Sequence, residues 1–279
     1  MAAWVLPWQL HNAGLNVIAT ARNPDKMVKL KAAGIETMSL DILSQESINE
    51  AVDNVSSLDI LVNNAGTAYS MPFSDRDIEQ AKETFDTNVW AQLAITQAFL
   101  PLLLKSKGMI VNQTSVVSTT APRSAIFSDT ARLELAPFGI KVIEPKTGAV
   151  STNMIMNQKE NTQITLPAGS LYEPAREAVE SAMRNDKMGS MASPADRWAA
   201  EVVGDLMKKN PPAMIWSYHL INYQATLPEN VHGMVSTFQA LAQFQSNDQS
   251  EFLSYNEIAG TTVYLSYAQS IANSYQDDQ

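Results

Sequence analysis

The chain contains no cysteine among its 279 residues. A disulfide framework, a thiolate zinc site and a cysteine nucleophile are therefore all excluded. Histidine is also scarce, because only His11, His219 and His232 are present, and they lie far apart in the sequence. We therefore expect no bound metal ion.

Positive charge and long apolar runs are lacking as well. The formal net charge of -10 argues against nucleic acid and anionic membrane surfaces as general partners. The apolar residues 1–10 have no basic segment before them, so we expect neither a signal peptide nor a membrane span. A cytoplasmic location is the default expectation.

What the chain does contain is a series of apolar, strand-like segments separated by predicted helices. These segments lie at residues 15–20, 35–40, 58–62, 109–112 and 141–146. Strands that alternate with helical stretches are typical of an α/β protein with a parallel sheet. The hydrophobic content of 45% is sufficient for a large core.

The most informative segment is the strand that begins at Leu58, which is followed directly by Asn63, Asn64, Ala65 and Gly66. This pattern indicates the carboxyl end of a buried parallel strand, where open α/β sheets bind their ligands. The segment resembles the short-chain dehydrogenase/reductase family. The resemblance implies a Rossmann-like, doubly wound parallel sheet and a cofactor that contacts Asn63, Ala65 and Gly66. An ordinary strand and turn is the alternative.

Other positions that match the family pattern indicate NADP(H). Arg22 follows the first of the strand-like segments, where an arginine accommodates the 2′-phosphate of this cofactor. By resemblance, Asp41 contacts the adenine, while Thr147, Gly148 and Thr152 belong to the segment beside the nicotinamide. Arg22 could instead be an ordinary surface residue, and Asp41 could instead cap a helix.

A long helix is expected to begin at Ser74, with Asp75 and Asp77 in its first turn. Asn88 lies in its middle, where asparagine is unfavourable because its amide competes for backbone hydrogen bonds. The resemblance implies that Asn88 perturbs the helix and holds a water molecule of a proton relay. A side chain that simply faces solvent is the alternative.

Ser115 follows the strand at residues 109–112 and resembles the family serine that binds the substrate carbonyl. The family also uses a tyrosine as general acid and a lysine that lowers its pKa, in the pattern YxxxK. This chain has no tyrosine between Tyr69 and Tyr172, and no lysine between Lys107 and Lys141. The catalytic pair of the family is therefore missing.

The shortened region is flanked by segments that still match the family. Residues 128–142 resemble the later part of the helix that carries YxxxK, whereas residues 116–127 are too few to supply its first turns. The glycine-rich turn TGxxxGxG and the strand before it are also absent, because no glycine precedes Gly14. We therefore expect an N-terminally truncated sheet. Loss of the central first strand would leave a gap of roughly 10 Å, or about two strand spacings, which the protein must fill or avoid by a different architecture. Residues 2–6 could form a short replacement strand, although residues 6–17 are barely long enough for the crossover that would follow.

The resemblance covers residues 9–215 and, within the family, is strongest to fungal reductases of the acyldihydroxyacetone phosphate reductase type. No lysine or arginine follows Lys209, and glutamine, serine, asparagine and tyrosine accumulate there. We expect residues 1–212 to form a degenerate Rossmann-like domain and residues 213–279 to form an irregular extension. The shortened helix often lies in the family's dimer interface, so the oligomeric state stays open.

Three functions agree with this sequence. The first is an NADP(H)-dependent reductase or dehydrogenase that acts on a small-molecule ketone or alcohol, lipid-like or from secondary metabolism, with impaired catalysis. The second is a non-redox family member, such as an isomerase, a cyclase or a protein that binds a ligand or partner. The third is a shortened gene product of an active reductase.

Overall fold

The computed structural model describes residues 5–115, 125–152, 164–184 and 192–217, and all of them belong to one compact unit, residues 1–221. The strands are β1 (Ile18–Ala21), β2 (Glu36–Ser39), β3 (Ile60–Asn63), β4 (Met109–Asn112), β5 (Thr114–Ser115), β6 (Lys141–Thr147) and β7 (Met214–Ser217). The α-helices are α1 (Val5–Asn12), α2 (Val28–Ala32), α3 (Gln45–Asp53), α4 (Ile78–Phe85), α5 (Ala91–Ser106), α6 (Ala125–Leu135), α8 (Arg176–Met183) and α9 (Ala195–Leu206). Shorter helical turns are η2 (Pro24–Met27), η3 (Phe73–Asp75), η4 (Asp86–Trp90), η6 (Ala136–Phe138) and η7 (Glu173–Ala175).

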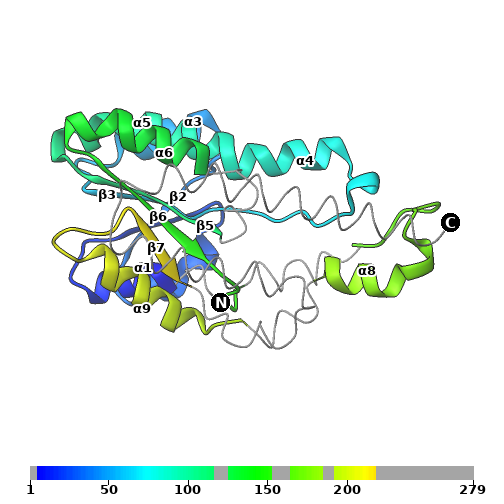
Figure 1. Cartoon of the computed structure of the whole chain (residues 1–279). Helices are drawn as coiled ribbons and strands as arrows, with labels where there is room; N and C mark the ends of the chain where they lie inside the picture. The colour runs from blue at the N-terminus through cyan, green and yellow to red at the C-terminus, as the bar shows by residue number, and fades with distance from the viewer. Residues whose placement is uncertain (1–4, 116–124, 153–163, 185–191, 218–279) are drawn as a thin grey trace, which may run out of the picture. The chain divides into compact units, whose positions relative to one another are not determined.

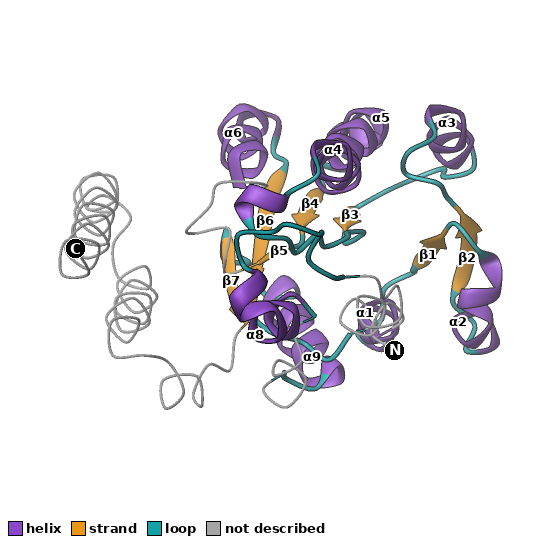
Figure 2. Ribbon diagram, turned by 90° about the vertical axis from the view of Figure 1, so that its right-hand side faces the viewer, coloured by secondary structure: helices purple, strands orange, loops and turns teal. Residues whose placement is uncertain are grey.

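The strands form parallel sheets, and helices connect them across both faces (Figure 2). In the larger sheet, β3 pairs with β4, and β4 pairs with β6. Strand β5 follows β4 and pairs with the same side of β6, whereas β7 pairs with the other side of β6. Strands β1 and β2 pair only with each other. The structure thus confirms the predicted Rossmann-like, doubly wound class.

Two apolar layers hold the larger sheet between its helices. On one face, α1 and α9 pack against Val111, Ile143 and Ile215. On the other face, α3, α5 and α6 pack against Ile110 and Val142. Neighbouring residues of one strand face opposite layers, as the alternation of side chains along a strand requires.

Within the described residues, no strand lies between β1 and β3, so the sheet is divided at the place of the family's first strand. Gly14 and Gly34 end the helices before β1 and β2 with φ of 88° and 83°. Such left-handed conformations favour glycine because a side chain there is strained. These glycine caps therefore fix both turns that lead into the smaller sheet.

The helix that we expected to begin at Ser74 begins at Ile78 instead. Arg76 has an extended backbone, with φ of -70° and ψ of 119°, which separates η3 from α4. The Asp77 side chain accepts a hydrogen bond from the Gln80 N–H at 2.9 Å and so caps α4. Asp75 therefore lies in a separate turn, and of the two expected acids only Asp77 acts on the helix.

Two further features concern the edges of the fold. Strand β7 lies beyond the domain boundary expected at residue 212, and it pairs with β6 at an edge of the larger sheet. The remainder of the predicted extension, residues 218–279, lies outside the described residues. None of the described helices is long and apolar enough to cross a membrane.

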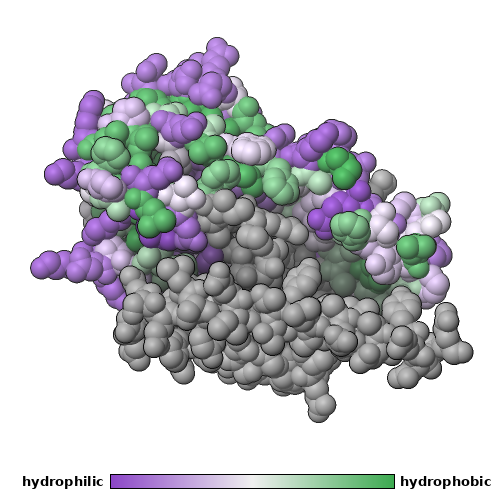
Figure 3. Space-filling view, turned by 45° about the horizontal axis from the view of Figure 1, so that its top comes forward, coloured by the Kyte–Doolittle hydropathy of each residue, from purple (hydrophilic) through white to green (hydrophobic). Residues whose placement is uncertain are grey.

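The outer face of α4, α5 and α6 carries exposed apolar side chains among hydrophilic ones (Figure 3). Ile78 and Leu133 are 64% and 78% exposed. Trp90, also exposed, stacks at 58° against Phe127 of α6, with ring centroids 6.1 Å apart. This contact joins the end of η4 to α6, the helix whose first turns the sequence predicts to be missing.

Candidate active site

Asn63 ends β3, and its side chain lies within a partly buried row of polar groups. Its Nδ2 donates to Asn112 Oδ1 at 2.9 Å and to Thr96 Oγ1 at 3.1 Å. Asn112 in turn donates to Ser128 Oγ of α6 at 3.0 Å. Because buried amides need partners, this row ties β3 and β4 to α5 and α6. Asn63 thus supports the edge of the sheet, while Ala65 and Gly66 are exposed above it.

Asn88 lies in η4, a π-helical segment between α4 and α5. Its Oδ1 accepts a hydrogen bond from the Thr67 N–H, and its Nδ2 donates to the Thr67 carbonyl, both at 2.8 Å. Single π-helical turns within longer helices frequently mark functional sites. The helix is therefore perturbed at Asn88 as expected, and the perturbation serves to hold the loop after β3. The water-holding role stays a prediction.

Ser115 ends β5 in register with Thr147 of β6. Thr147 Oγ1 accepts hydrogen bonds from Trp198 Nε1 at 3.0 Å and from Gln113 Nε2. The next residue, Gly148, donates its N–H to the Ser217 carbonyl at 3.0 Å. The predicted carbonyl-binding and nicotinamide-side residues are thus brought to one edge of the sheet, and α9 and β7 hold them there.

Thr152 follows this edge. Ser151 donates its backbone N–H to the Ser193 carbonyl at 2.9 Å, and Val150 forms a parallel bridge with Ser193. Thr152 is half-buried directly after these contacts. Residues 153–163, which include part of the predicted substrate loop, lie outside the described residues.

A buried ion pair within β6 was not predicted. Lys146 Nζ donates to Glu144 Oε1 at 2.6 Å, and the two side chains are 4% and 0% exposed. Lys146 is in register with Thr114, and Thr147 with Ser115, so the Lys146 and Ser115 side chains lie on opposite faces of the sheet. Glu144 Oε2 has no hydrogen-bond partner among the described residues. The alternation along β6 places both charges on the Val142 side, beneath α6.

Arg22 and Asp41 lie together at the smaller sheet. They follow the carboxyl ends of β1 and β2, where Ala21 pairs with Ser39. Arg22 is exposed, and Asp41 Oδ1 accepts from the Leu43 N–H at 3.1 Å. The predicted adenosine-side residues are therefore neighbours, but they belong to a different sheet from Asn63 and Ser115.

The described residues fit the two ends of a dinucleotide better than its centre. The exposed Arg22 guanidinium suits a phosphate, and the edge formed by Gly66, Ser115 and Gly148 suits a flat ring and its ribose. The described residues contain no glycine-rich turn at the gap between β1 and β3, where the pyrophosphate would lie.

Comparison with known proteins identifies the family. The model of the short chain dehydrogenase family matches residues 8–163. The chain belongs to the short-chain dehydrogenase family. It is 62% identical over 204 residues to a short-chain dehydrogenase/reductase of Pestalotiopsis microspora, which covers 73% of this chain and 75% of that protein.

More distant relatives agree with this assignment. The NADPH-dependent 1-acyldihydroxyacetone phosphate reductase of Schizosaccharomyces pombe is 33% identical over 239 residues, covering 77% of this chain and 81% of the relative. A short-chain dehydrogenase from Streptomyces avermitilis has the same fold, with a TM-score of 0.64 at 22% identity over 88% of this chain and 94% of the other. A short chain dehydrogenase from Burkholderia cenocepacia in complex with NADP has a TM-score of 0.60 at 20% identity. The match covers 85% of this chain and 90% of the other.

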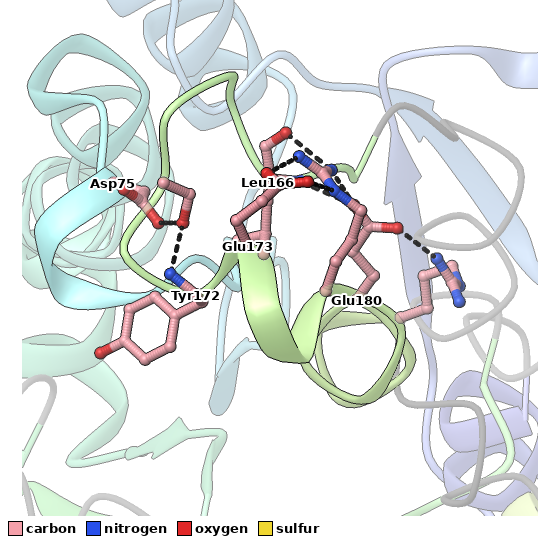
Figure 4. Close-up of polar contacts among 8 residues, drawn as sticks. Asp75, Leu166, Tyr172, Glu173 and Glu180 are labelled. Atoms are coloured by element: carbon pink, nitrogen blue, oxygen red, sulfur yellow. Dashed lines mark hydrogen bonds and ion pairs between the residues drawn. The ribbon is translucent and has the colours of Figure 1, made fainter.

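In this short-chain dehydrogenase, residues 164–184 form a segment that we call the strap (Figure 4). Arg176 holds the strap together, because its guanidinium donates to the Leu166 carbonyl at 3.0 Å and pairs with Glu173 and Glu180, each at 2.6 Å. The Leu166 N–H donates to Glu180 Oε1 at 3.0 Å. The start of the strap is therefore fastened to α8.

The strap should loosen in acid. The Leu166 N–H lowers the pKa of Glu180 below its ordinary value of 4.5, and the hydrogen bond and charge of Arg176 lower it further. Because the folded pKa lies below the unfolded one, this stabilisation is complete above about pH 4.5 and is lost as pH falls through the folded pKa. The NMR shift of the Leu166 amide should follow this titration, and E180Q should abolish it. A midpoint at or above 4.5 would contradict the assignment, and E177Q serves as the control.

Proposed function

We propose that this chain is an NADP(H)-dependent reductase of a lipid-like or secondary-metabolite ketone, with slow proton transfer and a weak hold on its cofactor. The observation that carries the proposal is the juxtaposition of Ser115 with Thr147 and Gly148 at the edge where Asn63 ends β3. The name of the Schizosaccharomyces relative, an NADPH-dependent reductase of an acylated phosphate ester, supports both the cofactor and the substrate class.

The chain's own residues have distinct roles in this proposal. Ser115 orients the carbonyl, and Thr147 and Gly148 border the nicotinamide. Asn88 holds the loop after β3, which carries Ala65 and Gly66 past the ring. The cofactor supplies the hydride when it is bound. A cytoplasmic location and a small-molecule partner belong to the same proposal.

Arg22 is expected to select NADPH over NADH. Arg22→Ala should weaken NADPH binding about tenfold and leave NADH binding almost unchanged, because one charge-assisted contact to the 2′-phosphate is lost. Titration of the purified full chain with each cofactor, followed by reduced-nicotinamide fluorescence, measures both affinities. Lys26→Ala, an exposed charge in the neighbouring η2, is the matched control.

Two outcomes would count against the proposal. The absence of saturable NADPH binding up to about 1 mM, a binding free energy weaker than about 4 kcal/mol, would eliminate a cofactor-dependent function. Equal losses of NADPH and NADH affinity in R22A would show that Arg22 does not recognise the 2′-phosphate. Saturable binding that is sensitive to R22A would support the proposed reductase.

The missing YxxxK pair favours a second candidate, in which the same edge binds a ligand or partner without redox chemistry. A ketone that raises the melting temperature of the protein in the absence of NADPH, and is never reduced in its presence, would favour this candidate. A full-length transcript that encodes the glycine-rich turn and YxxxK would instead favour a shortened product of an active reductase.

A further inference from the structure

Two strand edges in the described part of the chain have no neighbouring strand. Strand β3 pairs only with β4, and β1 pairs only with β2. In Figure 2, β1 and β3 are successive strands with no described strand between them. Val5 and Leu6 begin α1, so the replacement strand considered for residues 2–6 does not form as a whole. Both sheets therefore turn an open edge toward one gap.

The hydrogen bonds of β3 identify the main-chain groups that face this gap. The carbonyls of Asp59 and Asn63 accept hydrogen bonds from N–H groups of β4 and of the residue that follows it, at 2.7 and 2.9 Å. Successive residues of a strand direct their main-chain groups to opposite neighbours. The N–H and C=O groups of Ile60 and Val62 therefore point away from β4 and into the gap.

The same geometry holds for β1. The Ala21 carbonyl accepts a hydrogen bond from the Leu40 N–H at 3.1 Å, so the main-chain groups of Ile18 and Thr20 point away from β2. Neither these groups nor the corresponding groups of β3 have a hydrogen-bond partner among the residues that the structure describes. Unpaired groups along a strand edge are a template for another strand, and leaving them unpaired in a protein interior costs free energy.

The gap lies between the same two apolar layers as the larger sheet. Val17, directly before β1, packs with Ile60 and Val62 in the layer of α1 and α9. Ile18 and Leu61 pack in the layer of α3, α5 and α6. Figure 1 shows these two groups of helices on opposite sides of the strands. Ile18, Ile60 and Val62 are only partly buried, although helices cover both faces. A strand that filled the gap would cover them, and its own side chains would enter both apolar layers.

We propose that this gap is an acceptor site for a β-strand of another polypeptide, apolar on both faces and rich in valine and isoleucine. Such a composition is typical of parallel strands that are buried on both faces. The α3 crossover joins β2 to β3, so the added strand runs parallel to both of its neighbours. Main-chain hydrogen bonds on two sides supply affinity, and the alternate side chains supply specificity.

The choice of partner follows from pairing and charge. A second copy of this chain has no described strand to donate, because each of them is already paired within its own sheet. The net charge of -10 favours a donor segment that is flanked by lysine or arginine. The expected partner is therefore a different protein with an extended apolar segment between basic residues.

Amide hydrogen exchange of the purified full chain, measured by NMR, tests whether the edges are open. The amides of Ile60 and Val62 should exchange about 100-fold or more faster than those of Leu61 and Asn63, which bond to β4. Slow exchange at Ile60 and Val62 in the free protein would mean that another segment already pairs with them, and would overturn the proposal.

A synthetic peptide, Lys-Lys-Val-Ile-Val-Ile-Val-Lys-Lys, then serves as the donor strand. Fluorescence anisotropy of the labelled peptide should show saturable binding with a Kd below about 1 mM. At 100 times this Kd, exchange at Ile60 and Val62 should slow by up to about 100-fold. The amide shifts of β1 and β3 should change more than those of β7, at the other edge of the larger sheet.

Two matched controls separate strand pairing from apolar adhesion. A peptide with N-methyl groups on alternate residues keeps the side chains but loses donors, and it should bind about tenfold or more weakly. V62P removes one N–H that faces the gap and should weaken binding of the unmodified peptide, whereas V62T keeps this N–H and should not.

Three results would contradict the strand-acceptor site. They are no saturable binding up to about 1 mM, equal affinity for the methylated peptide, and shift changes centred on β7. No cofactor enters these assays, so a failed NADPH titration and a failed peptide titration are separate results.

Discussion

Replacing Lys146 with methionine should lower the free energy of unfolding by about 3–5 kcal/mol. Methionine fills much of the same space but leaves the Glu144 carboxylate without its counter-ion, in a side chain that is 0% exposed. A charge stranded in the core cannot regain the hydration that it lost on folding. Urea unfolding followed by circular dichroism measures the loss.

The double variant E144L/K146M tests whether the stability lost in K146M comes from the unpaired Glu144 carboxylate. Replacing both charges with apolar side chains should restore stability to the wild-type level or above it, because the desolvation cost of both ions disappears. Lys141→Met, an exposed change in the same strand, should stay within about 0.5 kcal/mol of wild type. A single-variant loss below about 1 kcal/mol, or a double variant as unstable as K146M, would contradict this interpretation.

Local chemistry explains why much of the fold could be predicted. Apolar strand segments that end in polar or glycine-containing turns identified the parallel strands. Gly14 and Gly34 marked the two helix ends that adopt left-handed conformations. Asn88 was singled out because asparagine is unfavourable inside a helix, and the helix does change to π geometry there. Each of these signals is carried by a few adjacent residues.

The features that could not be predicted depend on residues far apart in the chain. Lys146 belongs to a strand-like segment but gives no sequence signal of burial, which requires α6 to lie above it. The contact between Ser170 and Asp75 joins positions 95 residues apart. The helix α4 begins only after the extended backbone at Arg76. Nothing in the sequence indicated this, because the acids at positions 75 and 77 both favour the first turn of a helix. Register and long-range packing decide such features, and a single sequence does not encode them visibly.

In the proposed reductase, the absence of a YxxxK pair from the sequence should make the rate of reduction depend strongly on the basicity of the product oxygen. Hydride addition to an ordinary ketone creates a strongly basic alkoxide, and losing a positioned general acid there costs about 10²- to 10⁴-fold in rate. A quinone instead gives a weakly basic phenolate-type oxygen, which water can protonate after the hydride has been transferred. We therefore expect quinones to be reduced at rates close to those of other family members, and unactivated ketones to be reduced far more slowly.

Single-turnover reactions with saturating NADPH, followed by loss of nicotinamide absorbance, test this selectivity because product release does not limit them. Ser115→Ala should slow the reduction of both substrate classes, since it removes the hydrogen bond proposed to orient the carbonyl, whereas Ser106→Ala, at the far end of α5, should slow neither. If an unactivated ketone reacts as fast as a quinone of matched size, another residue supplies the proton. In that case a group outside the YxxxK pattern has taken over the acid role.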